Sequence, residues 1–208
     1  MNLIKLLYPD RCPYCNRVIL SELYACHKCA EDFPDKGIET RAIGGYRCVS
    51  AFLYQDKFCE AVLRFKFSNY PQYAEKLAFA VKNALDNTET PDVVTFVPMY
   101  IAKQRRRGYN QAELLAKELA KLLSVPYEEL IIKHKDNKEQ HKCKSYRERR
   151  NNVKGVYKTV DKSRIEGKSI LVIDDIITSG NTLGECCRLL EKAKARHISC
   201  ATVCVVNK

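Results

Sequence analysis

The sequence predicts an α/β fold in which a mostly parallel sheet is flanked by helices. Residues 93–97, 169–173 and 197–206 form short runs dominated by apolar residues, as in strands buried on both faces. The segments between these runs place apolar residues at helical spacing. Buried strands that alternate with amphipathic helices are typical of a parallel sheet covered on both sides. The length of 208 residues suits one such domain with a small appendage.

Each expected element has its own local evidence. The first strand is rich in β-branched and aromatic residues, and the second ends at Pro98, which cannot continue a buried strand. After Asn110, apolar residues recur on one helical face. In chain order we expect a strand at 47–54, helical segments around 61–65 and 77–85, a strand at 93–97, a helix over 110–123, a strand at 169–173, a helix over 182–193 and a strand at 197–206.

The composition limits the classes of partner and compartment. A net charge of +11 predicts anionic partners, such as phosphorylated metabolites or nucleic acid. No segment approaches the roughly 20 apolar residues of a membrane helix, so we expect no membrane insertion. The opening residues 1–9 are too short and too soon interrupted for a secretory signal, and we expect a cytoplasmic protein. Most of the 11 cysteines outside two CxxC pairs lie in apolar stretches, where reduced cysteine is an ordinary core residue.

Two CxxC pairs, separated by ten residues, lie near the amino terminus. The residues are Cys12, Cys15, Cys26 and Cys29. Two short loops of this kind can face each other and place four thiolates around one tetrahedral ion. We therefore predict a structural zinc knuckle over residues 1–36, followed by a second domain over residues 37–208. His27 is surplus to a complete set of four thiolates, and a redox dithiol is the weaker alternative because no strand precedes the pairs.

The segment from Ile170 to Thr182 carries the strongest chemical signal. A buried strand delivers two carboxylates to its carboxyl end, where ligands bind in open α/β sheets. A Thr-Ser-Gly-x-Thr turn then opens a helix, whose amino terminus attracts anions. The alternative is an ordinary capped helix, which the combination of acids and turn residues disfavours. The candidate ligand-binding residues are Asp174, Asp175, Thr178, Ser179, Gly180, Asn181 and Thr182.

Two basic segments complete the pattern. Arg105, Arg106 and Arg107 follow the strand that ends at Pro98, and consecutive arginines before a glycine can chelate pyrophosphate or a nucleic-acid backbone. Taken alone, these arginines would suit a solvated turn. Because the chain also has a candidate phosphate-binding turn at 178–182, we favour ligand binding. The tract from Lys133 to Lys154 is dense in Lys and Arg, and we expect a loop or a helix with a charged face.

The segment 170–182 resembles the loop of type I phosphoribosyltransferases that binds phosphoribosyl pyrophosphate (PRPP). The resemblance implies a type I phosphoribosyltransferase-like fold. It also implies that Asp174 and Asp175 hold the ribose 2′- and 3′-hydroxyls, and that residues 178–182 surround the 5′-phosphate. Purine-salvage members commonly have an aspartate where this chain has Thr178, which argues against salvage of a purine base.

The order of the motifs resembles the ComF/GntX family of competence-associated proteins. The shared features are the four-cysteine knuckle, an Arg-Arg-x-Gly-Tyr-Asn-Gln stretch at 105–111 preceded by Pro98, a segment from Gln140 to Tyr157, and the phosphate loop. Tyr109 and Tyr157 stand where the family commonly has Phe. Lys138-Glu139 precedes Gln140, where a small or hydroxyl residue is usual, so the alignment of that loop is loose. The resemblance implies a part in DNA uptake during natural transformation and leaves the reaction open.

Two functional hypotheses follow. In the first, the protein transfers phosphoribosyl from PRPP to an acceptor. Mg²⁺ and a basic set comprising Arg105–Arg107, Lys142 and Arg149 then neutralise the departing pyrophosphate, with 142–150 closing over it. No general base is evident. In the second, the fold is a non-catalytic module that senses a nucleotide or holds single-stranded DNA for a competence helicase. The basic tract, with Tyr146 to stack on a base, suits that hypothesis, while a solvated loop is its plainest interpretation. The sequence leaves the acceptor, turnover and oligomeric state open.

Overall fold

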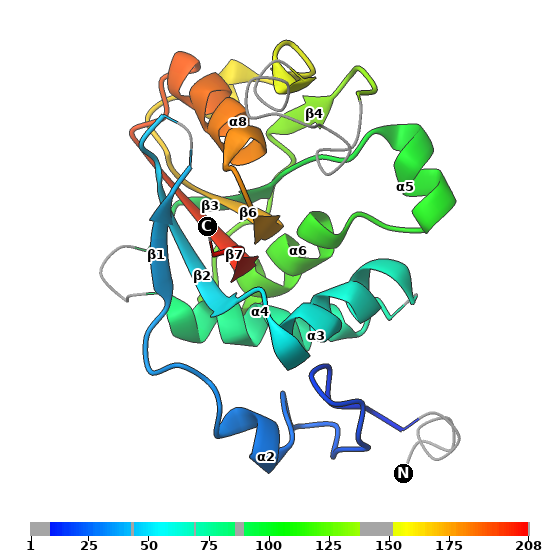
Figure 1. Ribbon diagram of the computed structural model, residues 1–208. Coiled ribbons are helices and arrows are strands. Elements are labelled where there is room, and N and C mark those ends of the chain that lie inside the picture. Colours follow the sequence, from blue (N-terminus) through cyan, green and yellow to red (C-terminus); the bar gives the residue numbers. More distant parts are fainter. Residues whose placement is uncertain (1–8, 43, 69, 86–89, 138–151, 208) are drawn as a thin grey trace.

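A computed structural model describes residues 9–42, 44–68, 70–85, 90–137 and 152–207 (Figure 1). Every strand and helix that the sequence predicts in these ranges is present, with ends shifted by a few residues. The elements are α2 (His27–Ala30), β1 (Ile38–Arg41), β2 (Arg47–Leu53), α3 (Asp56–Phe67), α4 (Tyr73–Ala84), β3 (Val93–Phe96), α5 (Ile101–Arg107), α6 (Gln111–Leu123), β4 (Ile131–Lys133), β5 (Tyr157–Thr159), a 3₁₀ turn η2 (Lys162–Arg164), β6 (Ser169–Ile177), α8 (Asn181–Lys192) and β7 (His197–Val205).

The main sheet has the strand order β1-β2-β7-β6-β3. The pairs β2–β7, β7–β6 and β6–β3 are parallel, and only β1 runs antiparallel, against β2. The sheet is therefore mostly parallel, as predicted. The sequence does not predict β1, because its four residues are alternately half-buried and exposed and carry little apolar signal. All four parallel strands end on the same edge, which collects their carboxyl-terminal residues in one place.

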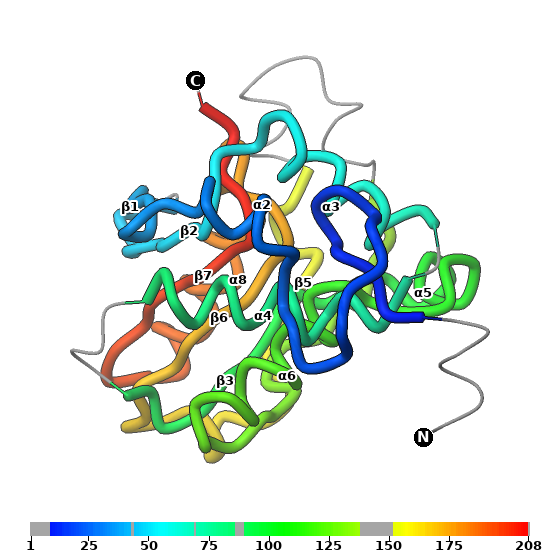
Figure 2. The backbone as a smooth tube through the Cα atoms, turned by 90° about the horizontal axis from the view of Figure 1, so that it is seen from below, coloured from blue at the N-terminus to red at the C-terminus, as the bar shows by residue number. Residues whose placement is uncertain are grey.

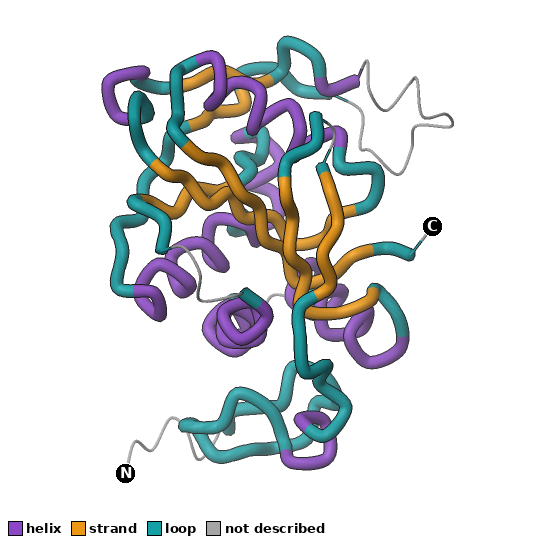
Figure 3. Tube along the Cα trace, turned by 90° about the vertical axis from the view of Figure 1, so that its left-hand side faces the viewer, coloured by secondary structure: helices purple, strands orange, loops and turns teal. Residues whose placement is uncertain are grey.

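Helices cover the sheet on both faces. In Figure 1, α3, α4 and α6 lie below the strands and α8 lies above them, and Figure 3 shows the strands between these helices. Helix α6 buries the predicted apolar face, which includes Leu115 and Leu119. Asn110 caps this helix: its side chain accepts a hydrogen bond from the backbone N–H of Ala112 and donates to the carbonyl of Val97. The cap fixes the start of α6 beside the carboxyl end of β3.

A two-stranded ribbon, β4–β5, lies beside α8 and joins the two ends of the basic tract. Lys133, at the start of the tract, pairs with Tyr157 across the ribbon. Asn137 donates a 2.7 Å hydrogen bond to the carbonyl of Asn152, close to where the tract ends. Residues 138–151 of the tract lie outside the described residues.

The cysteine-bearing segment packs against α3 and α4. Tyr14 is fully buried and contacts the rings of Phe33, Phe52 and Phe58. Figure 2 shows this segment, in blue, lying over the helices on that side of the molecule. The segment therefore shares the aromatic core of the larger unit. The boundary at residue 36 stays a prediction. No helix in the described part of the chain combines the length and apolarity needed to cross a bilayer.

Candidate functional site

A cavity of about 1080 Å³ opens at the carboxyl ends of the parallel strands. The residues that directly follow three of these strands line it: Tyr54 after β2, Val97 after β3 and Val206 after β7. The last four residues of β6 and the turn after it form another part of the wall. The cavity thus lies where ligands bind in open α/β sheets.

The two adjacent acids of β6 have different surroundings. Successive side chains of a strand point to opposite faces of the sheet. Asp175 forms a 2.7 Å ion pair with Lys66 of α3. Burial, together with the charge of Asp175, raises the pKa of Asp174 to about 8, although the Asp175 N–H, Lys66 and Lys133 oppose this rise. One carboxylate is therefore paired with a lysine, and the other is mostly protonated at neutral pH and ionises about one pH unit higher.

The turn that follows β6 leads directly into α8. Gly180 adopts a left-handed conformation with φ 68° and precedes the first helical residue, Asn181. Asn181 is 3% exposed and donates from Nδ2 to the Ser179 hydroxyl at 2.8 Å, while its Oδ1 has no hydrogen-bond partner among the described residues. The five predicted residues 178–182 all line the cavity. The arrangement directs the amino terminus of a 12-residue helix toward the cavity, where an anion is stabilised.

The arginine segment forms a short helix, α5, that ends at Gly108, where φ is 92°. Arg106 and Arg107 line the cavity, whereas Arg105 is exposed and is not part of the lining. Arg107 donates a 2.9 Å hydrogen bond to Gln111 Oε1 and lies 5.3 Å from the ring centre of Phe67. The Gln111 side chain is buried, and its Nε2 has no partner in the described chain. Two of the three arginines thus face the ligand space, together with an unpaired amide donor.

Three lysines of the cavity were not singled out from the sequence as site residues. Lys66 comes from α3, Lys103 from α5 and Lys133 from β4. Lys103 forms a 3.1 Å ion pair with Asp136 and donates to the carbonyl of Asn137. Burial lowers the pKa of Lys133, and the neighbouring Lys103 lowers it further. Lys103 lies six residues after the predicted strand at 93–97, and Lys133 is the first residue of the basic tract, so the sequence held a weak signal for these two. Nothing in the sequence marks Lys66, which comes to the cavity through the packing of α3.

Lys142 and Arg149, the two remaining basic residues predicted for the site, lie outside the described residues. The same holds for Tyr146 and the arginines around it. Their part in ligand or nucleic-acid binding stays a prediction.

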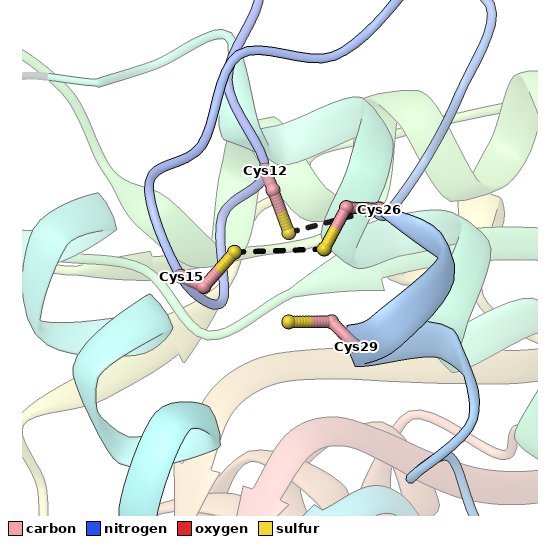
Figure 4. Close-up of side chains that lie close together, drawn as sticks. All are labelled: Cys12, Cys15, Cys26 and Cys29. Atoms are coloured by element: carbon pink, nitrogen blue, oxygen red, sulfur yellow. Dashed lines mark hydrogen bonds between the residues drawn. The ribbon is translucent and has the colours of Figure 1, made fainter.

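The four predicted cysteines come together in one cluster (Figure 4). Cys12 and Cys15 lie on one loop, and Cys26 and Cys29 lie at α2. All four Sγ atoms are within 4.8 Å of one another. Four thiolates at 2.3 Å from a tetrahedral ion would lie about 3.8 Å apart, so the cluster fits a metal ion. His27 points elsewhere: its side chain is 92% exposed, and its Nδ1 lies 3.0 Å from a carboxylate oxygen of Glu31.

The protonation of the cluster also suits a metal. Burial raises the pKa of Cys12 and Cys29. Burial opposes ionisation of Cys15 as well, but the backbone hydrogen bond from Arg17 and the neighbouring cysteine side chains outweigh it and lower its pKa to about 7. Buried thiols packed this closely ionise together only when a cation balances their charge. The cluster can therefore hold a metal ion.

The phosphoribosyl transferase domain model matches residues 109–208 of this chain. Competence protein F of Haemophilus influenzae is 31% identical over 196 residues, which cover 90% of this chain and 81% of that protein. Competence protein ComFC of Bacillus subtilis is 31% identical over 157 residues, covering 74% and 62% of the two chains. DNA utilization protein YhgH of Escherichia coli K12 is 24% identical over 200 residues, covering 93% and 83%.

Among solved structures, the allosteric regulatory enzyme of purine biosynthesis overlaps with a TM-score of 0.47 and 21% identity, over 68% of this chain and 30% of that chain. An adenine phosphoribosyltransferase overlaps with a TM-score of 0.46 and 16% identity, over 82% of this chain and 85% of that chain. Both TM-scores are below 0.5, so the assignment of the fold depends on the matched domain model and on the strand order of the sheet.

Proposed function

The chain belongs to the competence protein F family and has the type I phosphoribosyltransferase fold, and we propose that it binds PRPP or a related sugar phosphate, with Mg²⁺, in the cavity at the strand ends. The observation that supports this most directly is the turn after β6. There, one continuous segment provides two carboxylates and a helix amino terminus to the same cavity.

The two halves of that segment suit the two ends of a ribose 5-phosphate. Asp175, together with Asp174 in its ionised form, accepts hydrogen bonds from the ribose hydroxyls as a charged acceptor. The backbone and hydroxyl groups of residues 178–182 hold the 5′-phosphate at the amino terminus of α8. Asn181, buried with an unpaired Oδ1, supports the proposal that polar ligand groups or water occupy this corner.

The basic residues suit the pyrophosphate end of PRPP. Lys103, Arg106 and Arg107 belong to α5 and line the cavity, so they reach it from a different element than the turn before α8. Guanidinium groups bind phosphate oxygens through two parallel hydrogen bonds. Mg²⁺ prefers oxygen ligands and is usually held together with substrate phosphates, so we expect it to enter with the ligand.

Calorimetry tests this proposal. Titration of PRPP, and of ribose 5-phosphate, in the presence of Mg²⁺ should give saturable binding. Replacing both acids (Asp174→Asn with Asp175→Asn) should weaken it at least tenfold, because each hydrogen bond to a charged acceptor contributes about 1.5–3 kcal/mol. The control is Asp161→Asn with Glu166→Gln, two carboxylates that are not part of the cavity lining. Equal affinity of the folded acid variant and the wild type would move the site elsewhere.

Phosphoribosyl transfer is the finer hypothesis. The reaction would break the bond between the anomeric carbon and pyrophosphate and form one to an acceptor nucleophile. Release of pyrophosphate from PRPP on addition of candidate acceptors would support a transferase. Tight binding without pyrophosphate release for any acceptor would instead support a binding module.

We propose zinc as the metal of the cysteine cluster, because four thiolates in a closed site select it. Four protein ligands leave no open position, so the ion would be structural. Metal analysis of protein purified without chelator should find about one zinc per chain. Cys12→Ser with Cys15→Ser should lose it, whereas Cys59→Ser, at a free thiol of α3 outside the cluster, should keep it. Full zinc content in the double variant would rule out these ligands.

The names of the relatives connect them with competence and with DNA utilization. On that basis we infer that this chain takes part in DNA uptake from the cytoplasmic side. A strain carrying Asp174→Asn with Asp175→Asn should take up exogenous DNA or use it as a nutrient less well than the wild type. Undiminished performance in both assays would separate the sugar-phosphate site from this role.

A further inference from the structure

Helix α3 carries polar side chains on two opposite faces. Lys57 and Arg64 are seven residues apart, which places them two turns apart on the same face. Lys66 follows Arg64 by two residues and is therefore rotated by about 200° around the helix axis. One face of α3 is turned to the cysteine cluster and the other to the cavity.

On the first face, the helix contacts the backbone of both CxxC pairs. Arg64 Nη1 donates to the carbonyls of Pro13 at 2.9 Å and of Tyr14 at 3.2 Å, the two residues between the first pair of cysteines. Lys57 Nζ donates to the carbonyl of Cys29 at 3.2 Å. These hydrogen bonds require the loops to keep the shape in which the four Sγ atoms converge.

On the other face, the end of α3 contacts the ligand site. Lys66 pairs with Asp175 at 2.7 Å, and the two side chains are 24% and 11% exposed. The carbonyl of Phe65 accepts a hydrogen bond from the Tyr109 hydroxyl, just after the arginine helix. A shift or rotation of α3 therefore changes the position of the Lys66 ammonium relative to Asp175, as well as the entry to α6.

We propose that α3 couples metal binding at the cysteine cluster to sugar-phosphate binding in the cavity, with Arg64 as the positioning residue. The ligand part of this inference rests on the proposed function above. Metal fixes the two CxxC loops, their carbonyls hold Arg64 and Lys57, and the helix then holds Lys66 against Asp175. Because such coupling is reciprocal, the ligand also strengthens metal retention.

The competing explanation is that apolar packing alone fixes α3. Tyr14 packs against Phe58 of α3 and against Phe52 of β2, and these contacts do not involve the metal. If they suffice, metal removal leaves the cavity unchanged. The experiment must therefore separate the metal and the Arg64 hydrogen bonds from the aromatic contacts.

Hydrogen exchange of the ligand-free protein tests the coupling without any assumption about the ligand. In metal-stripped protein, amides of α3 and of residues 174–182 should exchange about fivefold faster or more, the lower end of typical coupling between sites. Zinc-loaded Arg64→Met, which keeps the aliphatic stem, should show the same change at 174–182. If that variant loses zinc, zinc-loaded Lys57→Met replaces it. Unchanged exchange at 174–182 in both stripped wild type and the variant overturns the proposal.

Affinity for ribose 5-phosphate with Mg²⁺ provides the second measurement, in a cycle of wild type and Arg64→Met, each with and without zinc. We expect metal removal to weaken binding to the wild type about fivefold or more, and to have little further effect on the variant. If Arg64 has a merely structural role, metal removal should weaken ligand binding to Arg64→Met by the same factor as it weakens binding to the wild type. Arg196→Met, which breaks a 3.0 Å ion pair with Asp92 away from both sites, should respond to metal removal as the wild type does. Absence of binding to zinc-loaded wild type would refute the proposed function, and exchange would then decide the coupling.

Discussion

Binding of a sugar phosphate should depend on pH through Asp174. Burial and the neighbouring charge of Asp175 raise the pKa of Asp174 to about 8. With this value, about a tenth of the molecules have an ionised Asp174 at pH 7, about half at pH 8 and about nine tenths at pH 9. The ionised carboxylate is the form that accepts hydrogen bonds on all its oxygen lone pairs.

The affinity should scale with the fraction of molecules in the binding-competent form. We therefore expect the affinity for ribose 5-phosphate to rise about fivefold from pH 7 to pH 8 and about tenfold from pH 7 to pH 9. The ligand phosphate itself titrates near pH 6, so it contributes little above pH 7. Calorimetry in buffers of different ionisation enthalpy should also detect the release of about 0.9 proton per ligand at pH 7.

The matched variant is Asp174→Asn, which should bind more weakly and with an affinity that does not change between pH 7 and pH 9. The raised pKa of Asp174 also predicts how the free energy of unfolding changes with pH. Its folded pKa lies above the unfolded value of about 3.9, so the folded state retains the proton between about pH 4 and pH 8. The free energy of unfolding of ligand-free wild type should fall as the pH rises through that window, and less so in the variant. A pH-independent affinity in the wild type, or the same pH dependence in the variant, would refute this reasoning.

Three further predictions concern stability, measured by urea unfolding. Tyr14→Phe should leave the free energy of unfolding unchanged or raise it by up to about 1 kcal/mol, because the buried hydroxyl has no partner among the described residues. A variant that is less stable than the wild type would show that the hydroxyl does have a partner. Glu128→Gln should cost about 1 kcal/mol at pH 7. Burial favours protonation of Glu128, but hydrogen bonds from Arg164 and Lys168 outweigh it and lower its pKa, so this contribution should vanish as the pH falls through that pKa. Asn110→Ala should cost about 1–2 kcal/mol through loss of the α6 cap, and a cost near zero would show that the cap is dispensable.

Local patterns in the sequence determined much of the architecture and part of the site. The apolar run at 169–173 predicts β6, and the acids and turn residues after it predict a ligand-binding strand end. The spacing of the cysteines predicts a cluster, which the structure contains. Each of these features lies within one short segment, where periodicity or spacing is visible without knowledge of the fold.

Only the tertiary structure decided which distant residues complete the site. Lys66 reaches Asp175 across more than a hundred residues of sequence, and it does so because parallel pairing places β7 between β2 and β6. The direction of the α5 helix decides that Arg106 and Arg107 line the cavity while Arg105 does not. Such placements depend on strand order and helix rotation, which are set by the packing of the whole core and leave no trace in any one segment. The sequence by itself thus determined the kinds of group present, and the fold determined which of them meet.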